Sequence, residues 1–209
     1  MEIRKPILDR KNLKETALVE SSLVDLDDTL VNEGSLDNKS IDEIKINSSV
    51  LNNVSLQSSK VEEIKIMDSS LNSVSFAGTN FSHTYFERST ITKSRLQGTQ
   101  LAECLIRDVV IDKSKCADVS FRFARIKSMV FLDCDLENAD FLGASLENVI
   151  FRNCSLKNSQ FSQTKLKNVS FKESNIEGIA IDKDSFGSIT VNTGQAIYLA
   201  SKLGLNIED

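Results

Sequence analysis

Two consecutive stretches of twenty residues decide the fold of this chain: IDEIKINSSVLNNVSLQSSK (41–60) and VEEIKIMDSSLNSVSFAGTN (61–80). Aligned without gaps, they are identical at nine of twenty positions. A repeat of this length is typical of a chain that stacks one structural unit on the next. Twenty residues are therefore expected to make one turn of a solenoid.

A shorter period of five runs inside the twenty-residue repeat. From Leu26 to Phe186 every fifth residue is Leu, Ile, Val or Phe, except for Cys116. The residue two places before each of these is mostly small, and the other three positions of every five carry most of the polar and charged side chains. A period of five fits neither an α-helix nor a single strand. It fits a coil that turns a corner every five residues, with one large and one small side chain pointing inward.

The large inward position also predicts how the core is filled. Of the 11 Phe residues, only Phe123 lies off the series, and from Leu136 to Phe171 Leu and Phe alternate. We expect Leu on one pair of opposite faces and stacked Phe rings on the other. On the Leu faces, Asn, Asp, Ser and Gly often follow the large residue by two positions, which favours type II turns there. Glu and Lys in the same slot of the other pair predict a different turn.

Two pentapeptides, TNFSH (79–83) and ADFLG (139–143), show the pattern of a small residue, Asn or Asp, Leu or Phe, and two variable positions. This pattern resembles the pentapeptide-repeat family over roughly residues 24–188. The resemblance implies an all-β solenoid, a right-handed quadrilateral β-helix of about eight coils with four pentapeptides in each. We expect the β-helix over residues 24–190.

The two ends depart from the pattern. Leu8, Leu13, Leu18 and Leu23 step by five but are out of phase with Leu26, so residues 1–23 are expected to form an N-terminal cap or a jogged first coil. Residues 191–209 are expected to form a short C-terminal helix or cap, with Thr193 as its N-cap and Gly204 at its end. Such a helix would cover the open edge of the last coil.

One motif suggests chemistry. In SLVDLDDTLV (22–31), Asp25, Asp27 and Thr29 have the Asp-x-Asp-x-Thr spacing of haloacid-dehalogenase-type phosphotransferases. The same residues fit the five-residue register, with Asp25 beside the inward Leu26, and no apolar strand of sufficient length precedes them. The repeat explains the motif without catalysis.

No other pattern predicts a catalytic, metal or cofactor site. His83 lies at an exterior position without a patterned partner. Cys104, Cys116, Cys134 and Cys154 occupy inward positions without CxxC spacing, so we interpret them as buried free thiols. The chain is therefore expected to be no enzyme and to use no cofactor.

Bulk properties limit the partners. With 209 residues and a net charge of −5, the chain suits one soluble domain and disfavours direct binding to nucleic acid. No segment predicts a membrane span or a signal sequence, so a cytoplasmic location is expected.

Function is therefore expected to depend on the exterior, and we hypothesise a non-enzymatic repeat scaffold that binds an unidentified protein partner. The resemblance implies an alternative, because the quinolone-resistance pentapeptide proteins bind DNA gyrase as rods that resemble duplex DNA. Under it, this chain would mimic DNA and modulate quinolone sensitivity through an acidic surface of Asp42, Glu43, Glu62, Glu63, Glu103 and Asp140. Two features argue against this alternative. No loop interrupts the repeats from Leu26 to Phe186, whereas relatives with the strongest protective effect often carry such loops. The neighbouring face is expected to be net basic, with Lys45, Lys65, Arg107, Arg125, Lys127, Lys165 and Lys167.

Two apolar groups could contact a partner. The first is an outward ladder of β-branched and Leu residues on successive coils, Val110, Val130, Leu132 and Ile150. Contiguous exposed apolar residues often mark interfaces, although β-branched residues also simply suit strands. The second group lies in the C-terminal segment and would suit a homodimer contact of the kind the family uses: Tyr198, Leu199, Leu203, Leu205 and Ile207.

Overall fold

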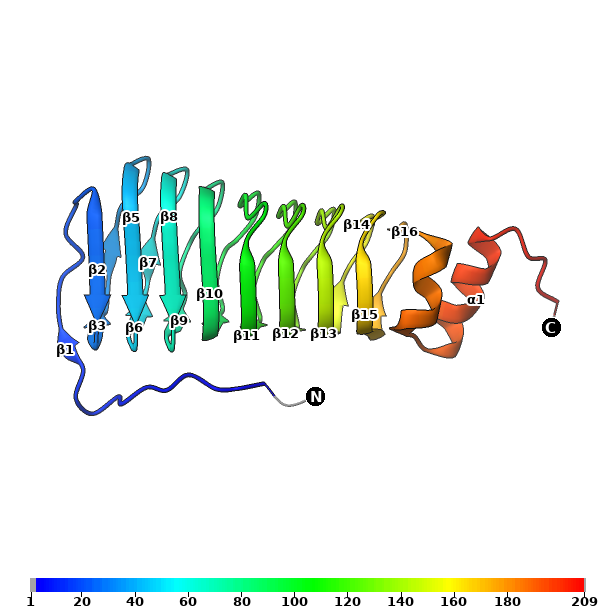
Figure 1. Ribbon diagram of the computed structural model, residues 1–209, viewed down its shortest axis with the longest axis horizontal. Coiled ribbons are helices and arrows are strands. Elements are labelled where there is room, and N and C mark those ends of the chain that lie inside the picture. The colour runs from blue at the N-terminus through cyan, green and yellow to red at the C-terminus, as the bar shows by residue number, and fades with distance from the viewer. Residues whose placement is uncertain (1–2, 209) are drawn as a thin grey trace.

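The structure is a computed structural model that describes residues 3–208, and it is a rod (Figure 1). The chain winds as a β-solenoid of about eight turns and ends in a short helix. The coil predicted from the period of five, and the all-β solenoid that the family resemblance implied, are confirmed. Residues 1–2 and 209, at the ends of the two expected terminal segments, lie outside the described residues.

Short strands follow one another along the rod. Their bounds are β1 Lys14–Glu15, β2 Leu23–Asp27, β3 Thr29–Val31, β4 Gly34–Ser35, β5 Ser40–Asn47, β6 Val50–Asn52, β7 Val54–Ser55, β8 Lys60–Met67, β9 Ser70–Asn72, β10 Asn80–Thr92, β11 Leu105–Asp112, β12 Arg125–Leu132, β13 Ser145–Ser155, β14 Gln160–Phe161, β15 Lys165–Asn175, β16 Ala180–Ile181 and β17 Ile189–Thr190. A 3₁₀ helix, Lys183–Ser188, and the α-helix α1, Thr193–Lys202, complete the chain.

Parallel ladders join each coil to the next at a separation of twenty residues. Ile46 lies beside Ile66, Ile66 beside Phe86 and Phe86 beside Ile106. This register explains the twenty-residue repeat, because equivalent positions of successive coils share one column. Each side chain therefore packs between the side chains at the equivalent positions of the preceding and the following coil.

The predicted inward residues form the core. Every member of the five-residue series from Leu26 to Ile176 is buried, while Ile181 and Phe186 are half-buried at the end of the rod. Stacked rings form the two expected Phe columns, with centroids 4.6 to 5.3 Å apart for Phe121, Phe141 and Phe161 and for Phe131, Phe151 and Phe171. Rings of the two columns meet edge to face, an arrangement that aromatic quadrupoles favour.

Two kinds of hydrogen bond complete the corners. At some corners the backbone closes a turn, as where the Ser59 N–H donates to the Leu56 carbonyl (3.3 Å). At others, an inward hydroxyl of the next coil accepts instead: the Ser49 N–H donates to Ser69 Oγ (3.1 Å) and the Ser94 N–H to Ser114 Oγ (3.0 Å). The small inward positions thus satisfy buried N–H groups that would otherwise cost free energy.

The expected division of turns between the Leu and Phe faces is wrong. Positive φ values occur on all four faces, including Glu103 (φ 59°) and Lys113 (φ 48°). Their N–H groups donate to the carbonyls of Arg122 and Leu132 in the next coil (2.8 and 2.9 Å). The ladder therefore holds these residues in a conformation that their own preference disfavours.

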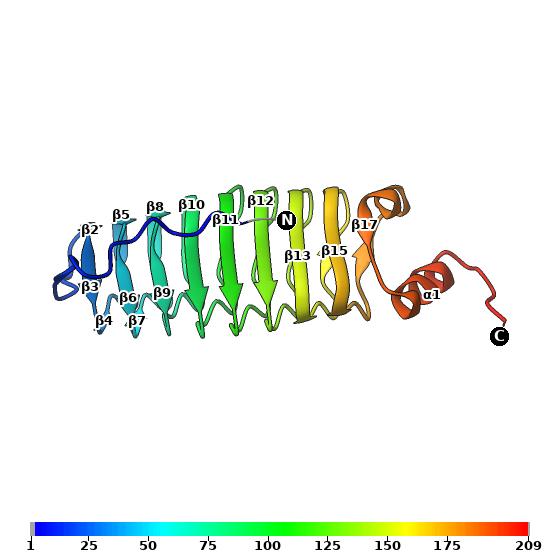
Figure 2. The ribbon, with the colours of Figure 1, turned by 90° about the horizontal axis from the view of Figure 1, so that it is seen from below.

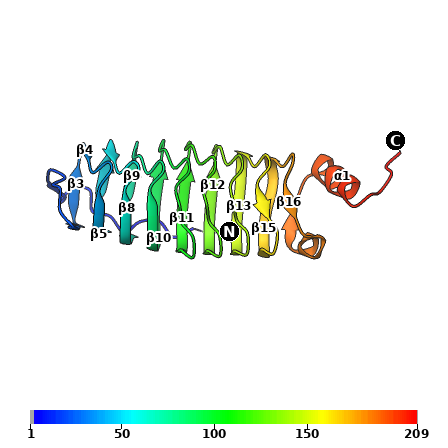
Figure 3. The same cartoon turned by 90° about the horizontal axis from the view of Figure 1, so that it is seen from above.

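The N-terminal segment runs along the rod first and then forms a shortened first turn. β1 pairs with β3 at a separation of fifteen residues (Lys14 beside Thr29), so the first turn lacks one pentapeptide, and Leu18 packs against the core. Residues 3–13, hereafter the strap, extend along the rod axis past several coils (Figure 2). From the opposite side the strands cover it (Figure 3).

At the other end, α1 begins one residue earlier than the sequence predicted. Asn192, and not Thr193, is the N-cap, and its side chain and that of Gln195 form a reciprocal capping box. Gln195 Nε2 also donates to the carbonyls of Phe171 (2.7 Å) and Ser174 (2.6 Å), which attaches the helix to the last coil. Gly204 follows with φ 83°, as expected of a residue that ends a helix.

The ring columns give a first prediction. Phe141→Ala should lower the free energy of unfolding by about 3–5 kcal/mol, because it leaves a cavity between Phe121 and Phe161. The adjacent Leu142→Ala is the matched control and should cost well under half of that, since Leu142 faces outward and is half-buried. Denaturant melts measure both, and equal costs would contradict the inward assignment.

A second prediction concerns Asp68, which is buried under the strap. The Arg88 guanidinium donates to both carboxylate oxygens of Asp68, so the pKa of Asp68 is held below its usual value. A lowered pKa stabilises the fold above the unfolded pKa of about 4, and this stabilisation is lost progressively as the pH falls from there through the lower pKa of the folded state. Asp68→Asn should therefore cost about 1–3 kcal/mol at pH 7 and clearly less at pH 3.

The control for this prediction is Asp118→Asn, which removes an exposed carboxylate in the same left-handed backbone conformation (φ 57°). Denaturant melts at both pH values should show little effect of it. A cost of Asp68→Asn that is the same at pH 3 and pH 7 would show that the ionised carboxylate does not contribute.

Candidate functional site

One wall of the rod changes shape at its middle. In β5, β8 and β10 the backbone stays extended at one corner position, which is occupied by Glu43, Glu63 and His83. None of these three residues has positive φ. From the next coil on, the equivalent residues Glu103, Phe123, Gly143 and Gln163 have positive φ, and a tight turn replaces the strand. In Figure 1 the upper edge of the rod accordingly consists of straight strands up to β10 and of curled turns from β11 onward.

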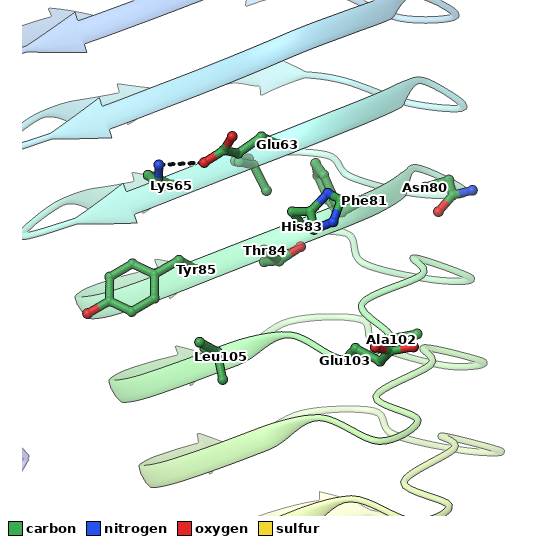
Figure 4. Close-up of a pocket in the computed structure, with 11 residues that line it drawn as sticks. Glu63, Lys65, Asn80, Phe81, His83, Thr84, Tyr85, Ala102, Glu103 and Leu105 are labelled. Carbon is green, nitrogen blue, oxygen red and sulfur yellow. Dashed lines mark ion pairs between the residues drawn. The ribbon is translucent and has the colours of Figure 1, made fainter.

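The change leaves a recess beside β10. β11 pairs with β10 only from Leu105, opposite Tyr85, so the wall around His83 has no strand partner in the following coil. The recess measures about 650 Å³ and is lined by Glu63, Ile64, Lys65, Asn80, Phe81, His83, Thr84, Tyr85, Ala102, Glu103 and Leu105. Figure 4 shows Tyr85 and Leu105 on neighbouring strands at one end and Glu103 on the turn at the other.

The polar groups of the recess are mostly engaged. Glu63 forms an ion pair with Lys65, whose hydrogen bond lowers the pKa of Glu63. The Tyr85 hydroxyl donates to Glu87, which raises the pKa of Tyr85. Among residues 3–208, Glu103 makes no ion pair, so its exposed carboxylate is free to meet a cation.

Phe123 lies next to the recess, beside Glu103 and Leu105, and the repeat pattern alone does not indicate it as a site residue. It is 52% exposed and has φ 58°, an uncommon conformation for an aromatic residue. Gly143 of the next coil provides the space for its ring, because a Cβ there would lie 2.5 Å from Phe123 Cε1. The signal was present, since Phe123 is the one Phe outside the inward series.

His83 of the recess and Asp27 of the phosphatase-like motif both form hydrogen bonds with groups of the neighbouring coil. His83 Nδ1 lies 3.1 Å from the backbone carbonyl of Glu62, and no side-chain acid or nucleophile is bonded to the ring within the described part of the chain. Asp27 of the phosphatase-like motif accepts from Asn47 Nδ2 (2.7 Å) on the exposed side of β2. No three His, Cys, Asp or Glu side chains between residues 3 and 208 are grouped to hold a metal.

The four cysteines are buried free thiols, as predicted. Burial raises the pKa of Cys104 to about 12. Cys134 and Cys154 lie in the same column of adjacent coils, and each Sγ donates to a backbone carbonyl. Neutral buried thiols are poor nucleophiles and poor metal ligands, so these residues act as small core side chains.

The predicted apolar ladder lies on β11, β12 and β13. Val110, Val130 and Ile150 are direct neighbours in the register and are half-buried. Leu132 lies in a separate column of the same strands, between Asp112 and Arg152. The structure thus brings three of the four residues into one line.

The predicted acidic surface is divided and partly neutralised. Glu43 pairs with Lys45 (2.8 Å), Glu62 with Lys60 (3.6 Å) and Asp140 with Arg122 (3.0 Å). Asp42 and Glu103 are exposed. The expected separation into an acidic and a basic face fails in the early coils, because β5 and β8 carry both signs on one straight strand.

The C-terminal residues take different positions. Leu199 is buried on the core side of α1, and the half-buried Tyr198 accepts a hydrogen bond from the Gly178 N–H (2.7 Å). Leu203, Leu205 and Ile207 are 51%, 60% and 47% exposed. Tyr198 and Leu199 attach α1 to the last coil, whereas the side chains of Leu203, Leu205 and Ile207 remain exposed.

Together, the coils and their inward columns define a pentapeptide-repeat β-solenoid. Sequence comparison agrees, because the profile of the pentapeptide repeat region matches residues 112–181 and that of pentapeptide repeats in eight copies matches residues 69–108. The chain belongs to the pentapeptide-repeat family.

The structure of QnrB1 shows the same fold, whereas HetL is a weaker match. Trypsin-treated QnrB1, a plasmid-mediated fluoroquinolone resistance protein, superimposes with a TM-score of 0.65 at 10% identity, over 93% of this chain and 95% of QnrB1. HetL, a pentapeptide-repeat protein involved in heterocyst differentiation regulation in the cyanobacterium Nostoc sp. strain PCC 7120, gives a TM-score of 0.33 at 12% identity, over 76% of this chain and 85% of HetL. No curated protein matches the sequence.

Over residues 3–208, no helix combines the length and the apolar character that crossing a bilayer requires.

A third prediction tests the contact between Phe123 and Gly143. Gly143→Ala should cost about 1–2 kcal/mol for the left-handed backbone and about 1 kcal/mol more for displacing the ring. Gly98→Ala is the matched control, because Gly98 has a similar φ (65° against 67°) and nothing lies within 4 Å of its added Cβ. Thermal or denaturant melts measure the difference.

The same prediction can be checked by a double mutant. In a Phe123→Ala background, the cost of Gly143→Ala should fall to that of Gly98→Ala, since the ring is gone. If the cost of Gly143→Ala is unchanged there, the ring does not rest on Gly143.

Proposed function

We propose that this protein is a non-enzymatic repeat scaffold that binds a protein partner through its exterior, with the recess and Phe123 as the main contact. The observation that carries the proposal is the position of the exposed large apolar residues. Leu105 (43%) lines the recess and Phe123 (52%) lies beside it, both in the body of the rod, whereas Ile7 lies on the strap and the other exposed large apolar residues lie near the two ends. Aromatic residues beside a concavity are typical of binding hot spots.

The backbone around the recess supports the same function. The part of β10 near His83 has no strand partner in the following coil, and such an edge can accept an extended segment of another protein. The exposed Glu103 and the ion-paired Glu63 would favour a segment with basic side chains. The ladder of Val110, Val130 and Ile150, on the neighbouring part of the rod, is proposed as a second contact.

A photo-crosslinking experiment tests the proposal in the native cell. A photoreactive phenylalanine analogue at position 123 should give a specific adduct with one protein, which mass spectrometry identifies. The same analogue at Leu23, which is 61% exposed, is the control and should not give that adduct. The absence of an adduct at position 123, or the same adduct at both positions, would contradict a partner site at the recess.

The alternative is a DNA mimic that binds DNA gyrase. The likeness of the fold to a fluoroquinolone resistance protein and the acidic residues near the recess favour testing it. The pairing of Glu43, Glu62 and Glu63 with lysines lowers the negative charge that a mimic needs, so we favour the scaffold.

A supercoiling assay separates the two functions. The scaffold should leave gyrase supercoiling and its inhibition by a quinolone unchanged. A mimic should alter one of them and lose the effect on combined reversal of Glu62, Glu63 and Glu103 to Lys. A gyrase effect that this charge reversal abolishes would replace the scaffold with the alternative.

Self-association through the C-terminal segment is proposed as a separate property. Leu203, Leu205 and Ile207 are exposed after α1. Leu203 also lines an apolar pocket of about 220 Å³, together with Phe186, Val191 and Leu199. Exposed apolar residues next to such a pocket suit an isologous contact between two copies.

A further inference from the structure

Two buried carboxylates lie beneath the strap. Asp68 and Asp108 are 7% and 5% exposed and occupy one corner column, in which other coils hold polar or partly exposed residues such as Ser48, Ser128 and Asn148. A buried carboxylate is costly unless a cation and hydrogen bonds compensate it. This corner therefore requires positive charge.

Charges of opposite sign alternate along the corner and join the rod to the strap. Arg88 donates to Asp68 through Nε and Nη2 (2.7 and 2.5 Å), and its Nη1 lies 2.6 Å from Glu87. Arg4 of the strap then connects Glu87 with Asp108: Nη2 to Glu87 Oε1 is 3.1 Å, and Nε to Asp108 Oδ2 is 2.7 Å. The rod supplies the cation for Asp68, whereas the strap supplies the main cation for Asp108.

The position between Glu87 and Asp108 suits arginine in particular. One planar guanidinium reaches two carboxylates from different coils, with Nε and Nη2 on Asp108 and Nη2 also on Glu87. A lysine ammonium has no such fork. Arg107, the other cation near Asp108, reaches it only at 3.6 Å. Without Arg4 the corner would hold a buried carboxylate with one long ion pair.

The strap is attached by few contacts. Besides Arg4, the Ile7 N–H donates to Asp68 (3.0 Å) and Arg10 Nη2 to Ser70 Oγ (3.3 Å). Residues 3–13 contribute no strand to the sheet, and Arg4, Lys5, Ile7 and Arg10 are exposed on their outer side. Contacts of this kind open at a small fraction of the free energy that holds the coils together.

The corner continues beyond the strap as an apolar surface. Val110 follows Asp108 by two residues on β11, and Val130 and Ile150 extend the same column toward the C-terminus. A longer segment with its arginine at Asp108 would place the residues N-terminal to that arginine over this ladder.

We propose that this corner is a binding site for an extended, arginine-bearing segment of a partner protein, and that the strap occupies it as an intramolecular competitor. The segment is recognised by one guanidinium between Glu87 and Asp108, by a backbone N–H at Asp68 and by apolar side chains over the ladder. The site is distinct from the recess, although Tyr85 of the recess donates to Glu87.

A peptide titration on the full-length protein tests the proposal. The probe is a fluorescent peptide with the sequence of residues 1–13, and its anisotropy reports binding. Arg4→Ala weakens the strap but keeps the chain intact, so it should bind the probe at least about tenfold more tightly than the wild type. Arg4→Gln, a second variant in case the first is unstable, should lie between the two.

Matched variants locate the binding. In the Arg4→Ala chain, Asp108→Asn should weaken probe binding at least about tenfold, while Asp118→Asn, on a corner away from the strap, should not. A probe with lysine at its fourth position should also bind about tenfold more weakly. Melting curves confirm that each variant is folded.

Three results would overturn the proposal. Equal binding of the probe by Arg4→Ala and by the Arg4→Ala/Asp108→Asn double variant would show that the corner is no peptide site. The absence of binding to Arg4→Ala would show the same. A wild-type dimer in sedimentation that Arg4→Ala dissociates would assign the site to the strap of a second copy instead of a partner.

Discussion

Backbone hydrogen bonds between residues twenty positions apart are the constraint on which the rest of this structure depends. They require each coil to close after four corners, so that Ile46, Ile66 and Phe86 fall in one column. Once that register is fixed, a large side chain every fifth residue fills the axis, and a small one between them leaves room for the corner. Exterior side chains are then free to vary without altering the fold.

The contrast between fixed inward positions and variable exterior positions explains how much of the structure could be predicted from the sequence. The period of five was sufficient for the fold class and the core, because the inward positions of a solenoid repeat through the whole chain. The step in the wall was not predictable, since Glu63 and Glu103 are the same residue in the same slot and yet only Glu103 has positive φ. The conformation at such a slot depends on the coils on both sides, and local preference does not contain that information.

The candidate sites show the same limit. The strap contact joins residues 104 positions apart, Arg4 and Asp108, outside the repeat, so no periodic pattern indicates it. Phe123 was visible as the one Phe outside the series, but its meaning required Gly143 of the next coil. Residues that break the pattern are therefore the ones to examine for function in a repeat protein, because the pattern itself accounts only for packing.

The strap also changes how the rod should come apart. In a solenoid, where each unit contacts only its neighbours, terminal units can fray one after another. The strap connects the first turn directly to the coil of Asp108, so the coils between them cannot open independently while Arg4 stays bound. Because the strap detaches more easily than the coils unfold, the N-terminal coils can fray only after Arg4 has been released, whereas fraying from the C-terminal end needs no such step.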